Sequence, residues 1–143
     1  MRYVFSYKAK KTGPEKRVSR PYAEVWLDVQ GRKLSFDFLV DSGADRTVIN
    51  QPLGLALGFE VLSGETPVSL GGVGGVASGY LRDLSLWIGE VQITTEIIWV
   101  QSDRVPLLLG QRDVFDRFDI TFSKSEEKIV FDLKKWVFAF PSG

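Results

Sequence analysis

Apolar and polar residues alternate with a period of two through most of this chain. In 23–29 (AEVWLDV), Val25, Leu27 and Val29 fall on one face and Glu24, Trp26 and Asp28 on the other. After a turn at Gln30-Gly31, 34–40 (LSFDFLV) puts Leu34, Phe36, Phe38 and Val40 on one face. A period of two is that of a β-strand, whose successive side chains point to opposite faces of a sheet. These two segments are therefore predicted to pair as a β-hairpin.

Two further hairpins are predicted from the same pattern. One joins 84–89 (LSLWIG) to 91–100 (VQITTEIIWV) through a Gly-Glu turn, and the other joins 118–123 (FDITFS) to 128–133 (KIVFDL) through the charged segment KSEE. The apolar segment 136–140 (WVFAF) could add one more strand.

Helix signals are few and short. Asn50 and Pro52 suit a first helical turn and Gly58 suits its end, which predicts one short helix. A second short helix is predicted in 112–118 (RDVFDRF), where apolar residues share a helical face. The pattern as a whole predicts an all-β domain, small and closed on itself, with one or two short helices.

Composition limits the chemistry. The 143 residues suit one domain, and 44% apolar residues suffice for a packed core. The sequence has neither cysteine nor histidine, so it lacks thiol nucleophiles, the Ser-His and Cys-His dyads, and imidazole or thiolate metal ligands. Carboxylate chemistry remains for acid-base work, and we expect no cofactor and no metal.

Charge and hydropathy indicate which partners and which cellular location to expect. Eighteen basic and eighteen acidic residues cancel, and the basic cluster in 8–17 (KAKKTGPEKR) is interpreted as a solvated loop. We expect no nucleic-acid partner. No apolar run approaches the ~18 residues of a membrane span or forms an early signal peptide, so we expect a soluble, cytoplasmic protein without a membrane partner.

The segment 38–49 (FLVDSGADRTVI) places Asp41 at the end of an apolar strand. A turn between two strands is one interpretation, because Asp, Ser and Gly are ordinary turn residues. A carboxylate among apolar residues is costly, however, unless it is hydrogen-bonded, paired or protonated. Asp41 is therefore a candidate for chemistry.

Two other segments stand out. The glycine-rich 69–80 (SLGGVGGVASGY) could cradle a phosphate, but a strand and not a helix is predicted after it, which favours the tip of a β-hairpin whose backbone approaches a ligand. A floppy surface hairpin is the alternative. In 106–115 (PLLLGQRDVF), three leucines before a glycine indicate a buried strand that stops where another backbone passes close by.

In this order, DSGA at 41–44, LGGVGG at 70–75 and Leu108-Leu109-Gly110 resemble the retropepsin-like aspartic proteases over about residues 20–120. The resemblance implies a retropepsin-like acid protease fold, a small closed β-barrel with a flap hairpin. It divides the chain into a protease domain at 20–143 and an N-terminal extension at 1–19 that could supply an interface strand.

The family's catalytic aspartate pair implies a homodimer, because this sequence has only one Asp-Ser/Thr-Gly triplet. By resemblance, a water between two Asp41 carboxylates attacks a bond in a peptide or protein substrate. The resemblance implies catalytic roles for Asp41, Ser42 and Gly43, substrate contacts for Ala44, Asp45, Val48, Gly71, Gly72, Val73, Gly74, Gly75 and Leu108, and structural roles for Arg20, Leu109 and Gly110.

One position departs from the family pattern, and the role of another residue stays open. Gln111 follows Gly110 where the family often has arginine, which puts in doubt a contact from Arg112 to Asp45. Arg20 is a candidate to pair with Asp45 across the dimer, or else is a solvated charge. The rival function is a non-catalytic dimerisation or peptide-binding module of the same fold, and a third is a β-protein whose aspartate turn is only structural.

Overall fold

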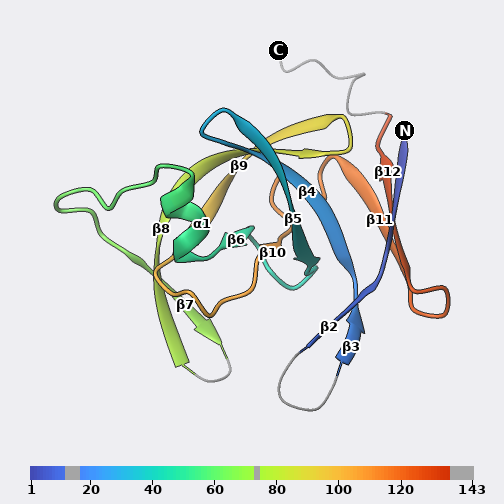
Figure 1. The fold of residues 1–143 in the computed structure, drawn as a ribbon, viewed down its shortest axis with the longest axis horizontal. Helices are drawn as coiled ribbons and strands as arrows, with labels where there is room; N and C mark the ends of the chain where they lie inside the picture. Colours follow the sequence, from blue (N-terminus) through green and yellow to red (C-terminus); the bar gives the residue numbers. More distant parts are fainter. Residues whose placement is uncertain (12–16, 73–74, 136–143) are drawn as a thin grey trace.

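The structure is a computed structural model, and it describes residues 1–11, 17–72 and 75–135 (Figure 1). Most of the described chain is β-strand, with one α-helix among the described residues. The elements are β1 (Arg2–Ser6), β2 (Lys8–Lys11), β3 (Arg17–Arg20), β4 (Tyr22–Val29), β5 (Arg32–Val40), β6 (Val48–Ile49), α1 (Gln51–Ala56), β7 (Val68–Gly72), β8 (Gly75–Ile88), β9 (Val91–Val100), β10 (Leu108–Leu109), β11 (Phe118–Ser123) and β12 (Lys128–Leu133).

A closed barrel forms the body of the molecule. Strands β4, β5, β10, β6, β9 and β8 follow one another in the main sheet, and β4 pairs with β8 at Trp26–Trp87 and Leu27–Leu86 to close the ring. Strand β7 pairs with β8 outside this ring. The expected all-β closed barrel is confirmed.

Two of the predicted hairpins supply barrel walls, and the third, β11–β12, belongs to a separate sheet. β4 and β5 turn at Gln30 and Gly31, whose φ angles of 50° and 89° suit the tight turns that join twisted strands. β8 and β9 turn at Gly89, and β11 and β12 turn in the charged segment, as predicted. Alternate side chains of β4 fill the interior, where Val25 and Leu27 have no exposed surface.

Helix α1 lies where the sequence predicts it. The Asn50 side chain accepts a 3.0 Å hydrogen bond from the Leu53 amide, so it caps the first turn. Gly58, with φ of +91°, lies just beyond the helix in a conformation that glycine adopts without strain. The helix packs on Trp99, whose indole nitrogen donates to the Gln51 carbonyl at 3.2 Å.

The second predicted helix, at 112–118, is wrong. This segment is a series of turns, although Phe118 still donates to the Val114 carbonyl at 3.1 Å. Asp113 has a φ of +66°, a left-handed conformation that a right-handed helix cannot contain. Val114 and Phe118 are nevertheless buried, so the apolar periodicity reported core contacts and not a helix.

A second sheet covers one side of the barrel. It has the order β1-β12-β11, and Tyr3 and Phe5 of β1 pack against Phe118 and Phe131 with ring centroids 6.3 and 5.6 Å apart. Residues 2–6 therefore pack on the same body as the rest of the chain, while the division at residue 19 stays a prediction. The strand expected at 136–140 lies outside the described residues.

Two hairpins project from the same side of the barrel, β2–β3 and β7–β8 (Figure 1). The β7–β8 hairpin carries the glycine-rich segment that was predicted to form a hairpin. Nowhere in the described parts of the chain is there a helix long and apolar enough to cross a membrane.

Candidate active site

Asp41 follows directly on β5, where the barrel brings three strand ends together. Its amide donates a 3.0 Å hydrogen bond to the Leu109 carbonyl. Strand β10 lies between β5, to which it is parallel, and β6, to which it is antiparallel. The short buried strand predicted at Leu108-Leu109 therefore sets the position of Asp41.

The Asp41 carboxylate is held within its own turn. Oδ1 accepts a 2.9 Å hydrogen bond from the Gly43 amide, and the Asp41 carbonyl accepts a 3.2 Å bond from the Ala44 amide. Asp41 is half-buried, while Ser42 and Gly43 are exposed. This turn satisfies one carboxylate oxygen, which lowers the cost of placing a polar side chain at the end of an apolar strand.

Gly110 lies under this loop at very short range. A Cβ built on it would stand 2.4 Å from both the carbonyl carbon and oxygen of Arg46 and 2.9 Å from the Ala44 oxygen. The Gly110 amide donates to the Thr47 hydroxyl at 3.1 Å. The sequence correctly predicted that another backbone passes close to this glycine.

Gln111 and Arg112 clamp the same loop from the other side. The Gln111 amide donates to the Ala44 carbonyl and the Arg112 amide to the Asp45 carbonyl, each at 2.9 Å. The Gln111 side-chain amide also donates to the Ser42 carbonyl. The loop is therefore fixed largely through its backbone carbonyls.

The Arg112 side chain pairs with Asp113 and not with Asp45. Its Nε lies 4.0 Å from Asp113 Oδ2, and no ion pair joins it to Asp45 within the described part of the chain.

A cavity of about 380 Å³ opens between the Asp41 loop and the β7–β8 hairpin. Leu70 and Gly71 of β7 form one wall, and the strands beneath the loop form the other. Asp41, Gly43, Ala44, Asp45, Arg46, Val48, Leu70, Gly71, Ile98 and Leu108 line it. A carboxylate, a mostly apolar floor and a glycine hairpin thus meet in one place.

Seven of the predicted site residues line this cavity: Asp41, Gly43, Ala44, Asp45, Val48, Gly71 and Leu108. The structure adds Arg46, Leu70 and Ile98 to the predicted lining. Gly72 pairs with Gly75 at the end of the β7–β8 pairing, whereas Val73 and Gly74 lie outside the described residues.

The remaining predicted residues lie around the cavity. Leu109 and Gly110 are buried beneath the loop, and Ser42 is exposed beside it. Arg20 ends β3, opposite Lys8 of β2, and is half-buried.

Arg46 was not predicted. Its Nη2 lies 3.0 Å from Glu96 Oε1 on β9. Glu96 and Ile98 share a face of that strand because side chains repeat every second residue, and Ile98 lines the cavity. Arg46 therefore brings a charged group beside the apolar floor, a placement that depends on the tertiary pairing of β6 with β9.

A metal site would need several acidic side chains together. No group of three or more His, Cys, Asp or Glu suitable for a metal ion occurs among residues 1–11, 17–72 and 75–135.

Comparisons with known proteins place this geometry in context. A family model described as aspartyl protease matches residues 25–112, a span that contains the Asp41 loop, the β7–β8 hairpin and β10. A comparison with curated protein sequences finds no match.

Solved structures share the fold. A retropepsin-like aspartic protease from Rickettsia conorii superposes with a TM-score of 0.64 at 19% identity, covering 91% of this chain and 98% of that one. EIAV protease in complex with an inhibitor gives a TM-score of 0.50 at 21% identity, covering 64% of this chain and 82% of that one.

Proposed function

This chain belongs to the aspartyl protease family and has an all-β retropepsin-like fold, and we propose that it is an aspartic endopeptidase acting as a homodimer. One observation carries the proposal. Asp41, held by the Gly43 amide, lines a cavity that reaches from the DSGA loop to the glycine hairpin. A purely structural aspartate turn would need no such cavity.

The second carboxylate would come from a second copy of the chain. The sequence contains one Asp-Ser/Thr-Gly triplet, so one chain supplies only half of the pair. A two-fold axis beside Asp41 would bring the two exposed Ser42 residues together, and they would hold the two loops in register. Arg20 of one subunit is a candidate partner for Asp45 of the other.

The chemistry follows from two carboxylates at short range. Both cannot ionise cheaply, so the pair shares one proton. The ionised member takes a proton from a water held between them, and that water attacks the peptide carbonyl. The protonated member stabilises the developing oxyanion through a hydrogen bond, and the first member then gives the proton that it took from the water to the leaving amine.

The cavity lining supports an apolar substrate preference next to the scissile bond. Val48, Leu70, Ile98 and Leu108 offer apolar contacts, and Asp45 would accept a hydrogen bond from the substrate backbone. The segment 70–75 would close over the substrate as a flap and exclude water. From the sequence we carry over the expectation of a cytoplasmic location and of no nucleic-acid partner.

Digestion of a peptide library from about pH 3 to about pH 8, a range that brackets an ordinary carboxylate pKa, tests the proposal. We expect cleavage strongest at mildly acidic pH, sensitive to a statine-type inhibitor and abolished in Asp41→Asn. The matched control, Asp103→Asn, changes an exposed aspartate that does not line the cavity. Wild-type cleavage by Asp41→Asn would contradict the proposal, and peptide binding without any cleavage would favour the non-catalytic module.

Mixing subunits tests the shared site. We expect wild-type chain refolded with an equal amount of Asp41→Asn chain to show about a quarter of the activity of the same total amount of wild-type chain. Random pairing makes about one dimer in four fully wild-type. Activity of about one half would mean that each chain acts alone.

A further inference from the structure

The loop 57–67 leads from α1 into the flap strand β7, and an ion pair ties it to β8. Arg82 Nη1 lies 2.6 Å from Glu65 Oε2, and its Nη2 donates to Glu65 Oε1 at 2.8 Å. Only 14% of the Arg82 side chain and 20% of the Glu65 side chain are exposed. The contact is bidentate, the geometry in which a guanidinium and a carboxylate fix each other's orientation.

Further contacts hold Arg82 in place. It donates to the Glu60 carbonyl at 2.5 Å and to the Leu81 carbonyl at 2.7 Å. Its guanidinium lies 5.7 Å from the Tyr80 ring centroid and 5.6 Å from that of Trp99. Arg82 therefore contacts the loop, its own strand and the barrel core at once.

Glu65 is fixed equally well. Its Oε1 also accepts a 3.1 Å hydrogen bond from the Leu62 amide, and its own amide donates to the Leu62 carbonyl at 3.0 Å. The hydrogen bond from Arg82 lowers the pKa of Glu65, and the same bond raises the pKa of Arg82. The pair thus stays ionised into the acidic range where an aspartic protease would work.

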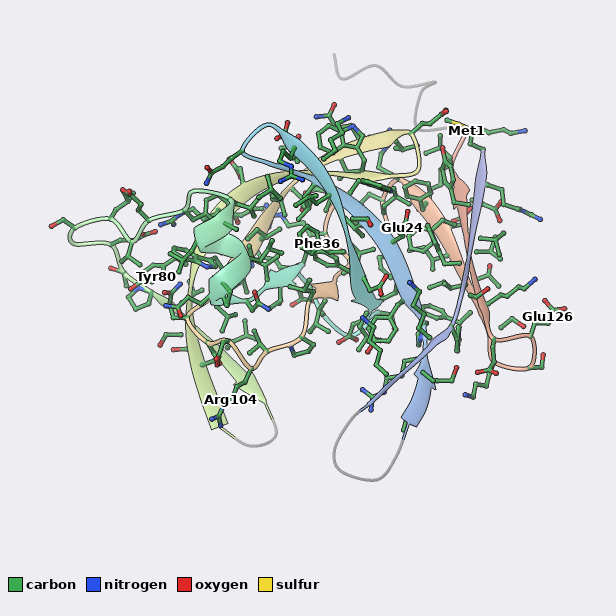
Figure 2. All side chains as sticks on the ribbon, in the orientation of Figure 1. Met1, Glu24, Phe36, Tyr80, Arg104 and Glu126 are labelled. Carbon is green, nitrogen blue, oxygen red and sulfur yellow. The ribbon has the colours of Figure 1, made fainter. Side chains whose placement is uncertain are left out.

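The position of the ion pair matters as much as its geometry. The pairing of β7 with β8 runs from Val68–Gly79 to Gly72–Gly75, and Arg82 lies just beyond this pairing, where β8 is bonded to β9 at Ile97. Within the described residues, β8 is the sole strand partner of β7. Figure 2 shows Tyr80 at this base of the hairpin. β7 is therefore held by its pairing with β8 and, just before its first residue, by Glu65.

We propose that Arg82 and Glu65 are positioning residues that fix the base of the β7–β8 hairpin, so that Leu70 and Gly71 close over the Asp41 loop in one defined position. The consequence for catalysis rests on the proposed protease function. The consequence for the hairpin does not, because it concerns the structure of β7 alone.

Amide hydrogen exchange tests the hairpin in the Asp41→Asn background, where cleavage plays no part. Glu65→Gln keeps the shape and the Leu62 contact but removes the charge, and we expect exchange in 68–72 and 75–79 to become about tenfold faster while 34–40 stays unchanged. Asp132→Asn, which breaks the remote Arg2–Asp132 ion pair, serves as the matched control and should change the exchange of none of these three segments. Unchanged exchange in the hairpin, or equal acceleration in all three segments, would overturn the proposal.

Kinetics on the wild-type background test the catalytic consequence. We expect Glu65→Gln and Arg82→Lys to lower kcat/KM by about ten- to one-hundredfold, mainly through a higher KM, because a flap displaced by about 1 Å misplaces substrate contacts. Glu65→Asp should recover part of the loss, and the double variant Glu65→Gln/Arg82→Gln should lose no more than either single change. Additive losses would contradict a shared role. If the wild type cleaves nothing, the protease function fails, and the exchange result still decides the role of the ion pair.

Discussion

The amide of Gly110 donates a 3.1 Å hydrogen bond to the hydroxyl of Thr47, a side chain with no exposed surface. Thr47 in turn offers its carbonyl to the Ile98 amide at 3.0 Å. One buried residue therefore joins the strand end beneath the Asp41 loop to the strand that forms the cavity floor. The position of Asp41 depends on this junction, because the carbonyl of Leu109, next to Gly110, accepts a hydrogen bond from the Asp41 amide.

Replacing Thr47 with valine should test this junction. The change keeps the shape but leaves the buried Gly110 amide without an acceptor, at a cost of about 1–3 kcal/mol in the free energy of unfolding. Thr47→Ser keeps the hydroxyl and should cost less. Urea denaturation of both variants checks this, and a larger loss for Thr47→Ser than for Thr47→Val would indicate that the methyl group, and not the hydrogen bond, matters.

Gly110→Ala should be poorly tolerated. The added methyl would stand 2.4 Å from the Arg46 backbone, which has no flexible side-chain end to move away. We expect the free energy of unfolding to fall by about 1–3 kcal/mol or more, the usual cost of overpacking. Gly71→Ala is the control, because a Cβ there has nothing within 4 Å. Thermal unfolding that shifts equally in both variants would show that the close approach is not limiting.

Gln111→Ala should reduce activity more than stability. It removes the side-chain donor to the Ser42 carbonyl but keeps the backbone bonds to the loop. We expect kcat to fall by about tenfold, since the loop that carries the reacting carboxylate loses one support, while urea denaturation changes by about 1 kcal/mol. The control is Gln92→Ala, an exposed glutamine on β9. A kcat equal to that of the control would show that the Gln111 side chain does not support the Asp41 loop during catalysis.

Asp37 should make stability depend on pH. Burial raises its pKa, but hydrogen bonds from Lys8 and Lys10 outweigh this and leave the pKa below its ordinary value. A carboxyl whose pKa is lower in the folded state contributes stability above its unfolded pKa and loses it as the pH falls through the folded pKa. The two contacts, at 2.9 and 3.1 Å, tie β2 to β5.

Urea unfolding at about pH 6 and about pH 3, on either side of an ordinary Asp pKa, checks this contribution. Asp37→Asn should lose about 0.2–1 kcal/mol at the higher pH, as for partly exposed ion pairs, and less at the lower pH. Asp103→Asn is again the control. A loss that grows as the pH falls would have the wrong sign for this mechanism.

The sequence predicted the strands well because a strand's burial repeats locally. In β4 the buried Val25 and Leu27 alternate with exposed neighbours, and the sequence alone shows that alternation. The same local reasoning failed at 112–118, where Val114 and Phe118 fit a helical face but Asp113 adopts a positive φ. Periodicity reports which residues are buried and does not determine the backbone between them.

The candidate site was predictable only where its residues form a contiguous motif. DSGA and the glycine hairpin can be read from the chain, whereas Arg46 reaches the site through its pairing with Glu96, fifty residues away. Gln111 contacts Ser42 across sixty-nine positions. Such contacts depend on the order of strands in the sheet, which local patterns do not encode.

Within the described residues, strand β1 pairs with one strand, β12, with Arg2 opposite Asp132 and Ser6 opposite Lys128. During synthesis, β1 leaves the ribosome long before its partner exists and must wait, unpaired, while the barrel strands emerge. A pairing of such high contact order is expected to form late and slowly. A nascent chain would therefore expose the unpaired edge of β1 until β12 emerges, and an unpaired strand edge can pair with another chain.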